Sequence, residues 1–177
     1  SDLMQIYQEM NIGTAKPTQE ERKGIKHYMI DVVGPEESFN VTKYKEMAES
    51  AMEEILEKGK LPIVVGGTGL YVSALVDAID FSEVPEDSKF RAYLSQKAKK
   101  EGIEALYQEL VAVDPQSASK IDKNNMRRVI RALEIYRVTG KTKTQLDQES
   151  IGELKYSYQI YGIMWDRQEL YDRIEKR

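Results

Sequence analysis

Apolar residues recur at helical spacing in the segment that follows Asn40. Tyr44, Ala48 and Met52 are four residues apart, and the pattern stops at Gly59. Residues with this spacing share one face of a helix, Asn is a favoured N-cap, and Gly commonly follows a helix end. The pattern therefore predicts an amphipathic helix that begins after Asn40 and ends before Gly59.

Three other segments carry apolar residues typical of strands. Residues 61–65, LPIVV, contain no polar residue, which is typical of a strand covered on both faces of a parallel sheet. Residues 25–33 and 156–165 are rich in β-branched and aromatic side chains. A helix capped by Asp166 is expected after the last of them. Strands that alternate with helices predict an α/β core built on a parallel sheet.

Residues 81–150 have a different texture, with consecutive helical patterns and no strand between them. We expect an all-helical insertion there. The α/β core would then be discontinuous, formed by residues 1–80 and 151–177.

Composition limits the class of protein. The chain has 177 residues, 32% of them charged and 41% hydrophobic, with no cysteine and a net charge of -4. Disulfides and thiolate metal sites are excluded, and no apolar run approaches the roughly 20 residues that span a bilayer. We expect a soluble, cytoplasmic protein. The first residue, Ser1, is followed at once by strand-like sequence, so we expect the natural N-terminus to be missing.

Four residues between the apolar run and the next helical pattern are candidates for anion binding. Gly66, Gly67, Thr68 and Gly69 stand at the predicted strand-to-helix turn. Glycine amides, a hydroxyl and a helix N-terminus suit a phosphate. The alternative is a tight turn whose glycines only permit positive φ.

Asp2 and a pair of late arginines are further candidates. A carboxylate at a strand end lies where open α/β sheets bind ligands and could act as general base, or it could be a simple cap. Arg167 and Arg173 could bind a polyanionic leaving group, or they could form surface ion pairs. His27, the only histidine, is expected to be structural.

The segment from Lys120 to Lys143 is strongly basic. It holds eight basic residues and two acidic ones, in a chain whose net charge is negative. Met126, Val129, Ile130 and Leu133 form the predicted buried stripe, which leaves the arginines of the same helix on the surface. The segment predicts a nucleic-acid contact, and a solvated helix face is the alternative.

Five ordered blocks resemble the tRNA dimethylallyltransferase (tRNA isopentenyltransferase) family. They are SDLMQIYQEMNIGTAKPT, GIKHYMIDVV, PIVVGGTGLYVSAL, NNMRRVIRALEIYRVTGK and DRQELYDRI. Leu3 stands where the family has Ser, and Tyr28 where it has a second His. The family's N-terminal P-loop and its C-terminal segment are absent from these residues, so the chain resembles a middle portion of a longer enzyme.

The resemblance implies a P-loop-NTPase-like fold and a prenyl transfer. A dimethylallyl group would move from its pyrophosphate to the exocyclic amine of the adenosine 3′-adjacent to a tRNA anticodon. Asp2 matches the family's catalytic base. Thr68 is assigned to catalysis by its place in the turn, with contact to the flipped nucleotide as the alternative. Mg²⁺ is implied, with no protein ligand assigned. We expect a monomer with no membrane association. The residues implied for pyrophosphate are Gly66, Gly67, Thr68, Arg167 and Arg173, and those for tRNA are Asp2, Leu3, Met4, Gln5, Arg91, Arg127, Arg128, Val129, Ile130 and Arg131.

Three other functions remain open from the sequence. An adenylate isopentenyltransferase would share the chemistry but accept a free nucleotide, and the basic helical insertion disfavours it. A P-loop kinase or related enzyme would transfer phosphoryl groups instead. A non-enzymatic RNA-binding module would use the basic helix alone.

Overall fold

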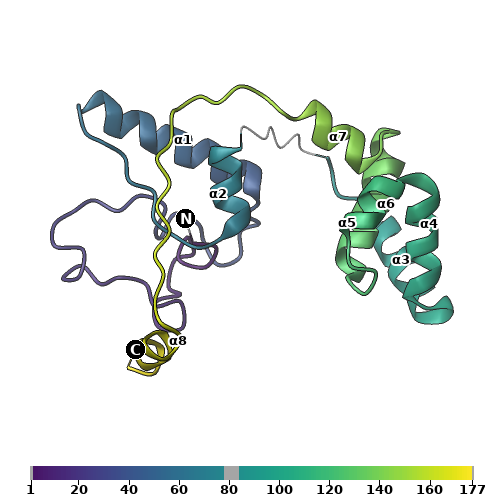
Figure 1. The fold of residues 1–177 in the computed structure, drawn as a ribbon, viewed down its shortest axis with the longest axis horizontal. Coiled ribbons are helices and arrows are strands. Elements are labelled where there is room, and N and C mark those ends of the chain that lie inside the picture. The colour runs from purple at the N-terminus through teal and green to yellow at the C-terminus, as the bar shows by residue number, and fades with distance from the viewer. Residues whose placement is uncertain (1, 78–83, 177) are drawn as a thin grey trace. The chain divides into compact units, whose positions relative to one another are not determined.

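A computed structural model of the chain describes residues 2–77 and 84–176 (Figure 1). The chain divides into two compact units, Ser1–Ala78 with Glu153–Arg177, and Ile79–Gly152. The first is called the split unit below and the second the helical unit. The sequence placed the corresponding boundaries near residues 80 and 150.

The described residues of the split unit form three helices, α1 (Val41–Glu57), α2 (Gly69–Val76) and α8 (Arg167–Glu175). The predicted helix after Asn40 is confirmed, because the Asn40 side chain accepts a hydrogen bond from the Lys43 N–H and Gly59 follows the helix with φ of 66°. α1 and α2 pack side by side (Figure 1). The buried rings of Tyr44 and Tyr71 stack between them with centroids 4.0 Å apart. Burial, with Tyr7 and Tyr44 nearby, raises the pKa of Tyr71 to about 12.

The predicted parallel sheet is not formed by the described residues. An isolated parallel bridge joins Tyr7 and Val33, and no described residue belongs to a strand. Residues 61–65 and 156–165 run without regular structure, and Ile63 is 78% exposed. A strand depends on backbone hydrogen bonds to a neighbouring strand, and none of the three apolar segments supplies that ladder to another. The predicted strands are therefore not confirmed by the described residues.

The turns of residues 2–33 are held by a nearly buried lysine. The Lys16 ammonium donates to the Tyr7 carbonyl at 2.6 Å and to the Asp31 carboxylate at 2.5 Å. Ile6, which is fully buried, accepts from the amides of Val32 and Val33 through its carbonyl. These contacts join the N-terminal segment to residues 31–33 without a continuous strand pair.

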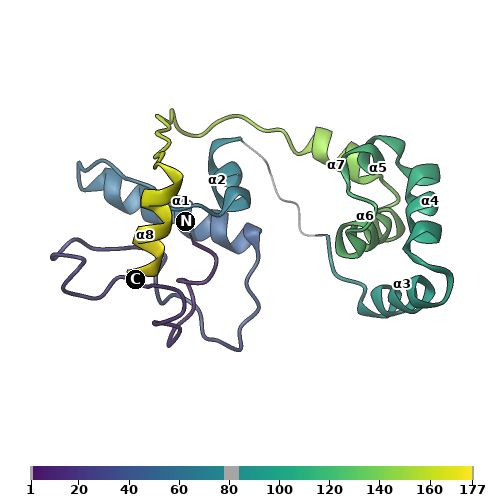
Figure 2. The ribbon, with the colours of Figure 1, turned by 60° about the horizontal axis from the view of Figure 1, so that its bottom comes forward.

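The helical unit contains α3 (Ser88–Glu101), α4 (Ile103–Val113), α5 (Pro115–Lys120), α6 (Met126–Thr139) and α7 (Lys143–Glu149). The expected run of consecutive helices is present there. α4 contacts α3, α5 and α6, and Figure 2 shows these helices gathered closely. The hydrophobic core of the helical unit includes Leu94, Leu106, Leu110, Val129 and Leu133. None of the helices described is both long and apolar enough to cross a membrane.

Candidate functional site

Asp2 forms a tight turn at the start of the described chain. Its Oδ1 accepts hydrogen bonds from the backbone N–H groups of Met4, at 2.8 Å, and Gln5, at 3.0 Å. Two donors on one oxygen fix the orientation of the carboxylate plane. The Gln5 side-chain amide donates to the carbonyls of Thr14 and Ala15, so this side chain is also held in place.

The glycine turn lies against the Asp2 turn. The Thr68 hydroxyl accepts a hydrogen bond from the Leu3 N–H at 3.1 Å, across 65 positions of sequence. Thr68 is the N-cap residue of α2 but makes no side-chain capping bond, because its oxygen faces Leu3 instead. A hydroxyl that accepts can still donate its own proton, so Thr68 keeps a donor for a ligand.

Gly66 and Gly67 give this turn its shape. Gly66 has φ of 155°, a conformation that L side chains rarely adopt. A Cβ added at Gly67 would meet no atom within 4 Å, so the backbone there is open on the side where that atom would point. The first amides of α2 have no partner within the helix, as at every helix N-terminus. The turn therefore has the open amides and the hydroxyl that an anion requires.

A cleft of about 880 Å³ in the split unit joins these elements. Asp2, Gln5 and Gly66 line it together with the apolar face of α1 and residues 60–65. Lys26, His27 and Lys58 stand among the other lining residues, and Nδ1 of His27 lies 2.9 Å from the Ile25 carbonyl oxygen. The cleft has the size of a site for a small organic ligand, with the carboxylate of Asp2 in its wall.

Arg167 and Arg173 are not part of this constellation. The guanidinium of Arg167 donates to the Tyr171 hydroxyl at 3.2 Å, and that of Arg173 lies 3.5 Å from the centre of the Trp165 ring. All described residues of α8 are exposed. We find no hydrogen bond or ion pair between α8 and either turn within the part of the chain that the structure describes. The predicted capping by Asp166 is confirmed by its bond from the Gln168 N–H.

Four arginines of the helical unit fall into two groups. Arg127 and Arg128 are exposed, and neither pairs with a carboxylate among residues 84–176 or 2–77. Arg91 and Arg131 both bind Glu134, whose side chain is fully buried. Val129 and Ile130 are buried in the core, which leaves their side chains no surface for RNA, whereas Met126, expected in the same stripe, is 36% exposed.

Glu134 is the residue that the sequence reasoning missed. Its two oxygens accept from Arg91 Nε and Nη2 and from the Asp87 N–H, all at 2.8 Å, and from Arg131 Nη1 at 2.6 Å. Burial alone would raise the pKa of Glu134, but these bonds, led by those from Arg91 and Arg131, lower it below its usual value. A glutamate beside Leu133 on the apolar stripe, three residues after Arg131, was the available signal.

No dedicated metal cage is present. Among residues 2–77 and 84–176 no three histidine, cysteine or acidic side chains are grouped as metal ligands. The Asp2 carboxylate and the Thr68 hydroxyl are oxygen donors of the kind Mg²⁺ accepts, but two donors are too few to hold it without ligand oxygens.

Comparisons with known proteins agree on one family. The IPP transferase family matches residues 5–177. The tRNA dimethylallyltransferases of Desulforamulus reducens and Acetivibrio thermocellus are 45% and 49% identical over the whole chain. The chain spans 63% and 57% of the length of these two relatives.

Solved structures similar to this chain come from the same family of enzymes. A tRNA delta(2)-isopentenylpyrophosphate transferase of Staphylococcus epidermidis matches 99% of the chain and 57% of its own, at 37% identity and a TM-score of 0.52. A eukaryotic dimethylallyltransferase acting on tRNA matches 85% of the chain and 37% of its own, at 35% identity and a TM-score of 0.67.

Proposed function

Because this chain belongs to the IPP transferase family, we propose that the protein it represents is a tRNA dimethylallyltransferase. The reaction moves a dimethylallyl group from dimethylallyl pyrophosphate to the exocyclic amine of the adenosine 3′-adjacent to the anticodon, and releases pyrophosphate. The enzyme works as a cytoplasmic monomer. The proposal concerns the complete protein, since the chain covers 57% to 63% of the two relatives named above.

One observation carries the proposal. The Leu3 N–H and the Thr68 hydroxyl join the two turns that the family motifs assign to base catalysis and to pyrophosphate. Asp2 and Gly66 line the same cleft. Prenyl transfer requires a proton acceptor and an anion site close together, and these two turns supply both.

Asp2 acts as the general base. The nitrogen of adenine forms a bond to the allylic carbon while the bond from that carbon to the pyrophosphate oxygen breaks, and the amine proton passes to the carboxylate. The lone pair of the amine is delocalised into the ring, so removal of the proton assists the attack. The two backbone N–H groups on Oδ1 hold the carboxylate ready for this step.

The leaving pyrophosphate is stabilised by the glycine turn. The Thr68 hydroxyl and the amides of Gly66 and Gly67 donate to its oxygens, and Arg167 and Arg173 join them once α8 is docked in the complete protein. Mg²⁺, when bound, neutralises part of the pyrophosphate charge. Asp2 and Thr68 would offer oxygen ligands to the ion, alongside the pyrophosphate oxygens.

Two apolar segments of the split unit are candidates for strands in the complete protein. Residues 61–65 and 156–165 expose long apolar side chains, of which Met164 is 94% exposed. We assign these segments as strands of a parallel, P-loop-NTPase-like sheet that forms with residues outside the chain. A sheet covered on both faces would bury the side chains that are exposed here.

The helical unit binds the anticodon stem-loop. Arg127 and Arg128, which pair with no carboxylate in the described part of the chain, offer exposed guanidiniums to the phosphate backbone, the usual source of affinity for nucleic acid. A free nucleotide would need no such surface, so the basic face favours tRNA over adenylate as the acceptor.

Asp2→Asn in the full-length protein tests the proposal. The amide oxygen can keep the bonds to Met4 and Gln5 but cannot accept the proton, so turnover on an anticodon stem-loop should fall by about 10² to 10⁴. Asp122→Asn is the matched control, because Asp122 makes the same type of turn with the Asn124 N–H at 2.9 Å. Equal turnover of the two variants would exclude Asp2 as the base, and a wild-type protein without prenyl transfer would exclude the function.

A further inference from the structure

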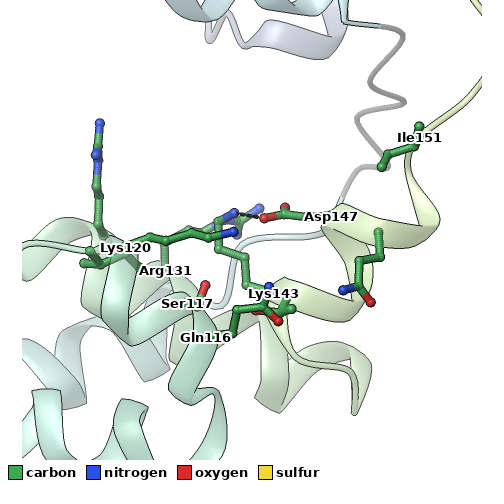
Figure 3. Close-up of a pocket in the computed structure, with 11 residues that line it drawn as sticks. Gln116, Ser117, Lys120, Arg131, Lys143, Asp147 and Ile151 are labelled. Carbon is green, nitrogen blue, oxygen red and sulfur yellow. Dashed lines mark hydrogen bonds and ion pairs between the residues drawn. The ribbon is translucent and has the colours of Figure 1, made fainter.

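A second hollow lies wholly within the helical unit, between α5, α6 and α7. Its volume is about 490 Å³. Figure 3 shows Lys120, Arg131 and Lys143, from three different helices, around it. This hollow, called the α5–α7 pocket below, also contains Arg128 and the apolar side chains of Ile121 and Ile151.

The pocket concentrates positive charge in a chain of net charge -4. Lys120, Arg128, Arg131 and Lys143 line it, against the single carboxylate of Asp147. Asp147 forms an ion pair with Lys143 (Figure 3). Lys120 and Arg128 pair with no carboxylate in the described part of the chain. Like charges held together in a concave surface attract an anion and raise its local concentration.

Two buried carboxylates hold the walls of the pocket. Asp114, which is 3% exposed, accepts from the Ser117 N–H at 3.0 Å and from the backbone and hydroxyl of Thr144 at 2.9 and 2.6 Å. It therefore ties α5 to α7. Glu134 holds one end of the Arg131 guanidinium, and the Val84 carbonyl accepts from the other at 3.0 Å. Walls fixed before a ligand arrives reduce the entropy lost on binding.

The lining residues suit a single nucleotide of a nucleic acid strand. Lysine and arginine bind phosphate oxygens, and Ile121 and Ile151 give an apolar surface to a ribose or a base. The volume is in the range of pockets that enclose a small organic group. The amides of Gln116 and Gln148 add hydrogen-bonding groups at the edge.

We propose that the α5–α7 pocket binds one phosphate-bearing nucleotide of the tRNA, other than the adenosine that is modified. Lys120, Arg128 and Lys143 hold the phosphate, and Ile121 and Ile151 contact its sugar or base. The inference rests on the proposed function, because it takes tRNA as the ligand, and it adds Lys120 and Lys143 to the residues that recognise it.

Paired lysine variants of the full-length protein test the proposal. Lys120→Ala with Lys143→Ala removes two charges from the pocket, and Lys99→Ala with Lys100→Ala removes two from the exposed end of α3 in the same unit. At about 0.15 M salt the pocket pair should weaken binding of an anticodon stem-loop at least tenfold and reduce the salt slope by about 1 to 2, and the control pair by less than threefold.

A bulk variant tests the sugar or base contact without a change of charge. Ile151→Trp adds bulk to the lining of the pocket and should weaken binding severalfold at an unchanged salt slope, whereas Val138→Trp on the exposed part of α6 should not. Circular dichroism and the affinity for dimethylallyl pyrophosphate serve as checks of folding.

Each outcome decides a different claim. If the two lysine pairs weaken binding equally, the pocket is not a site and only the general charge matters. If Ile151→Trp binds like wild type, the sugar or base contact is wrong. If wild type binds the stem-loop without prenyl transfer, the proposed function fails while the pocket result still stands. If wild type does not bind the stem-loop, both proposals fail.

Discussion

The helical unit and the split unit carry comparable amounts of apolar sequence but use it differently. In the helical unit Leu106 and Leu110 are completely buried, and the described helices close a core among themselves. In the split unit Ile63 and Ile163 are about four-fifths exposed. A helix satisfies its backbone within one segment, whereas a strand needs a neighbour that the sequence must bring from elsewhere.

The largest expected effect on the free energy of unfolding comes from a residue that is buried in this chain, compared with one that is exposed here and proposed to be buried in the full-length protein. Leu110→Ala should lower the free energy of unfolding of the helical unit by about 4 kcal/mol through lost burial and a cavity. Ile63→Ala should change that of the split unit by less than about 0.5 kcal/mol in this chain and by about 2 to 4 kcal/mol in the full-length protein. Hydrogen exchange read by mass spectrometry resolves both units in one sample. Equal costs of Ile63→Ala at the two lengths would refute the assignment of residues 61–65 as a buried strand.

A smaller effect is expected for the buried charge of the helical unit. Glu134→Ala leaves Arg91 and Arg131 without their shared partner. It should lower the free energy of unfolding by about 3 kcal/mol, because both guanidiniums are only one-third exposed. Glu149→Ala is the control, because its pair with Lys141 is half exposed and should be worth less than about 0.5 kcal/mol. Chemical denaturation of both variants measures the difference. A similar loss of unfolding free energy in the two variants would mean that the buried Glu134 stabilises the helical unit no more than a surface ion pair does.

The smallest effect concerns acid. The pKa values of Glu134 and Asp114 lie below their ordinary 4.5 and 3.8, because their hydrogen bonds outweigh the effect of burial. The unfolded chain therefore takes up protons first, and the stability these groups give is present above pH 4.5 and is lost as the pH falls below it. The helical unit should exchange amide hydrogens faster at pH 3.5 than at pH 6, after correction for intrinsic rates.

Salt distinguishes the two units in that experiment. Hydrogen bonds from Lys58, Lys26 and Tyr28 lower the pKa of the partly exposed Glu54 in the split unit to about 2. At about 1 M salt the screening length is about 3 Å, so any acid effect from Glu54 should disappear. The effect on the helical unit should persist because its carboxylates are shielded from solvent. Loss of both effects in salt would show that Glu134 and Asp114 act as surface charges.

The sequence predicted helices well because their signals are local. Asn40 and Asp166 both cap the helices that the pattern placed after them. Spacing and cap residues within a few positions decide such an element, whatever its later packing. The strand predictions rested on apolar composition and carried no information about a neighbouring strand, and residues 61–65 form no strand in the described chain.

The candidate site shows the same division. Asp2 and Thr68 were predicted from separate motifs, and the structure joins them through the Leu3 N–H. The arginines were counted as one basic surface, but no count of charges reveals that Glu134 binds Arg91 and Arg131 and leaves Arg127 and Arg128 open. The pairing of each arginine with a carboxylate depends on how α3 packs against α6, and the sequence of either helix alone does not predict that packing.

The stacking of Arg173 on Trp165 gives the molecule an internal reporter. Trp165 is the single tryptophan of the chain, so its ultraviolet emission comes from one place, where the guanidinium faces the indole. An anion that draws the guanidinium away would change the charge next to the excited ring. The docking of the last helix onto a phosphate group can thus be followed by intrinsic fluorescence, without any attached dye.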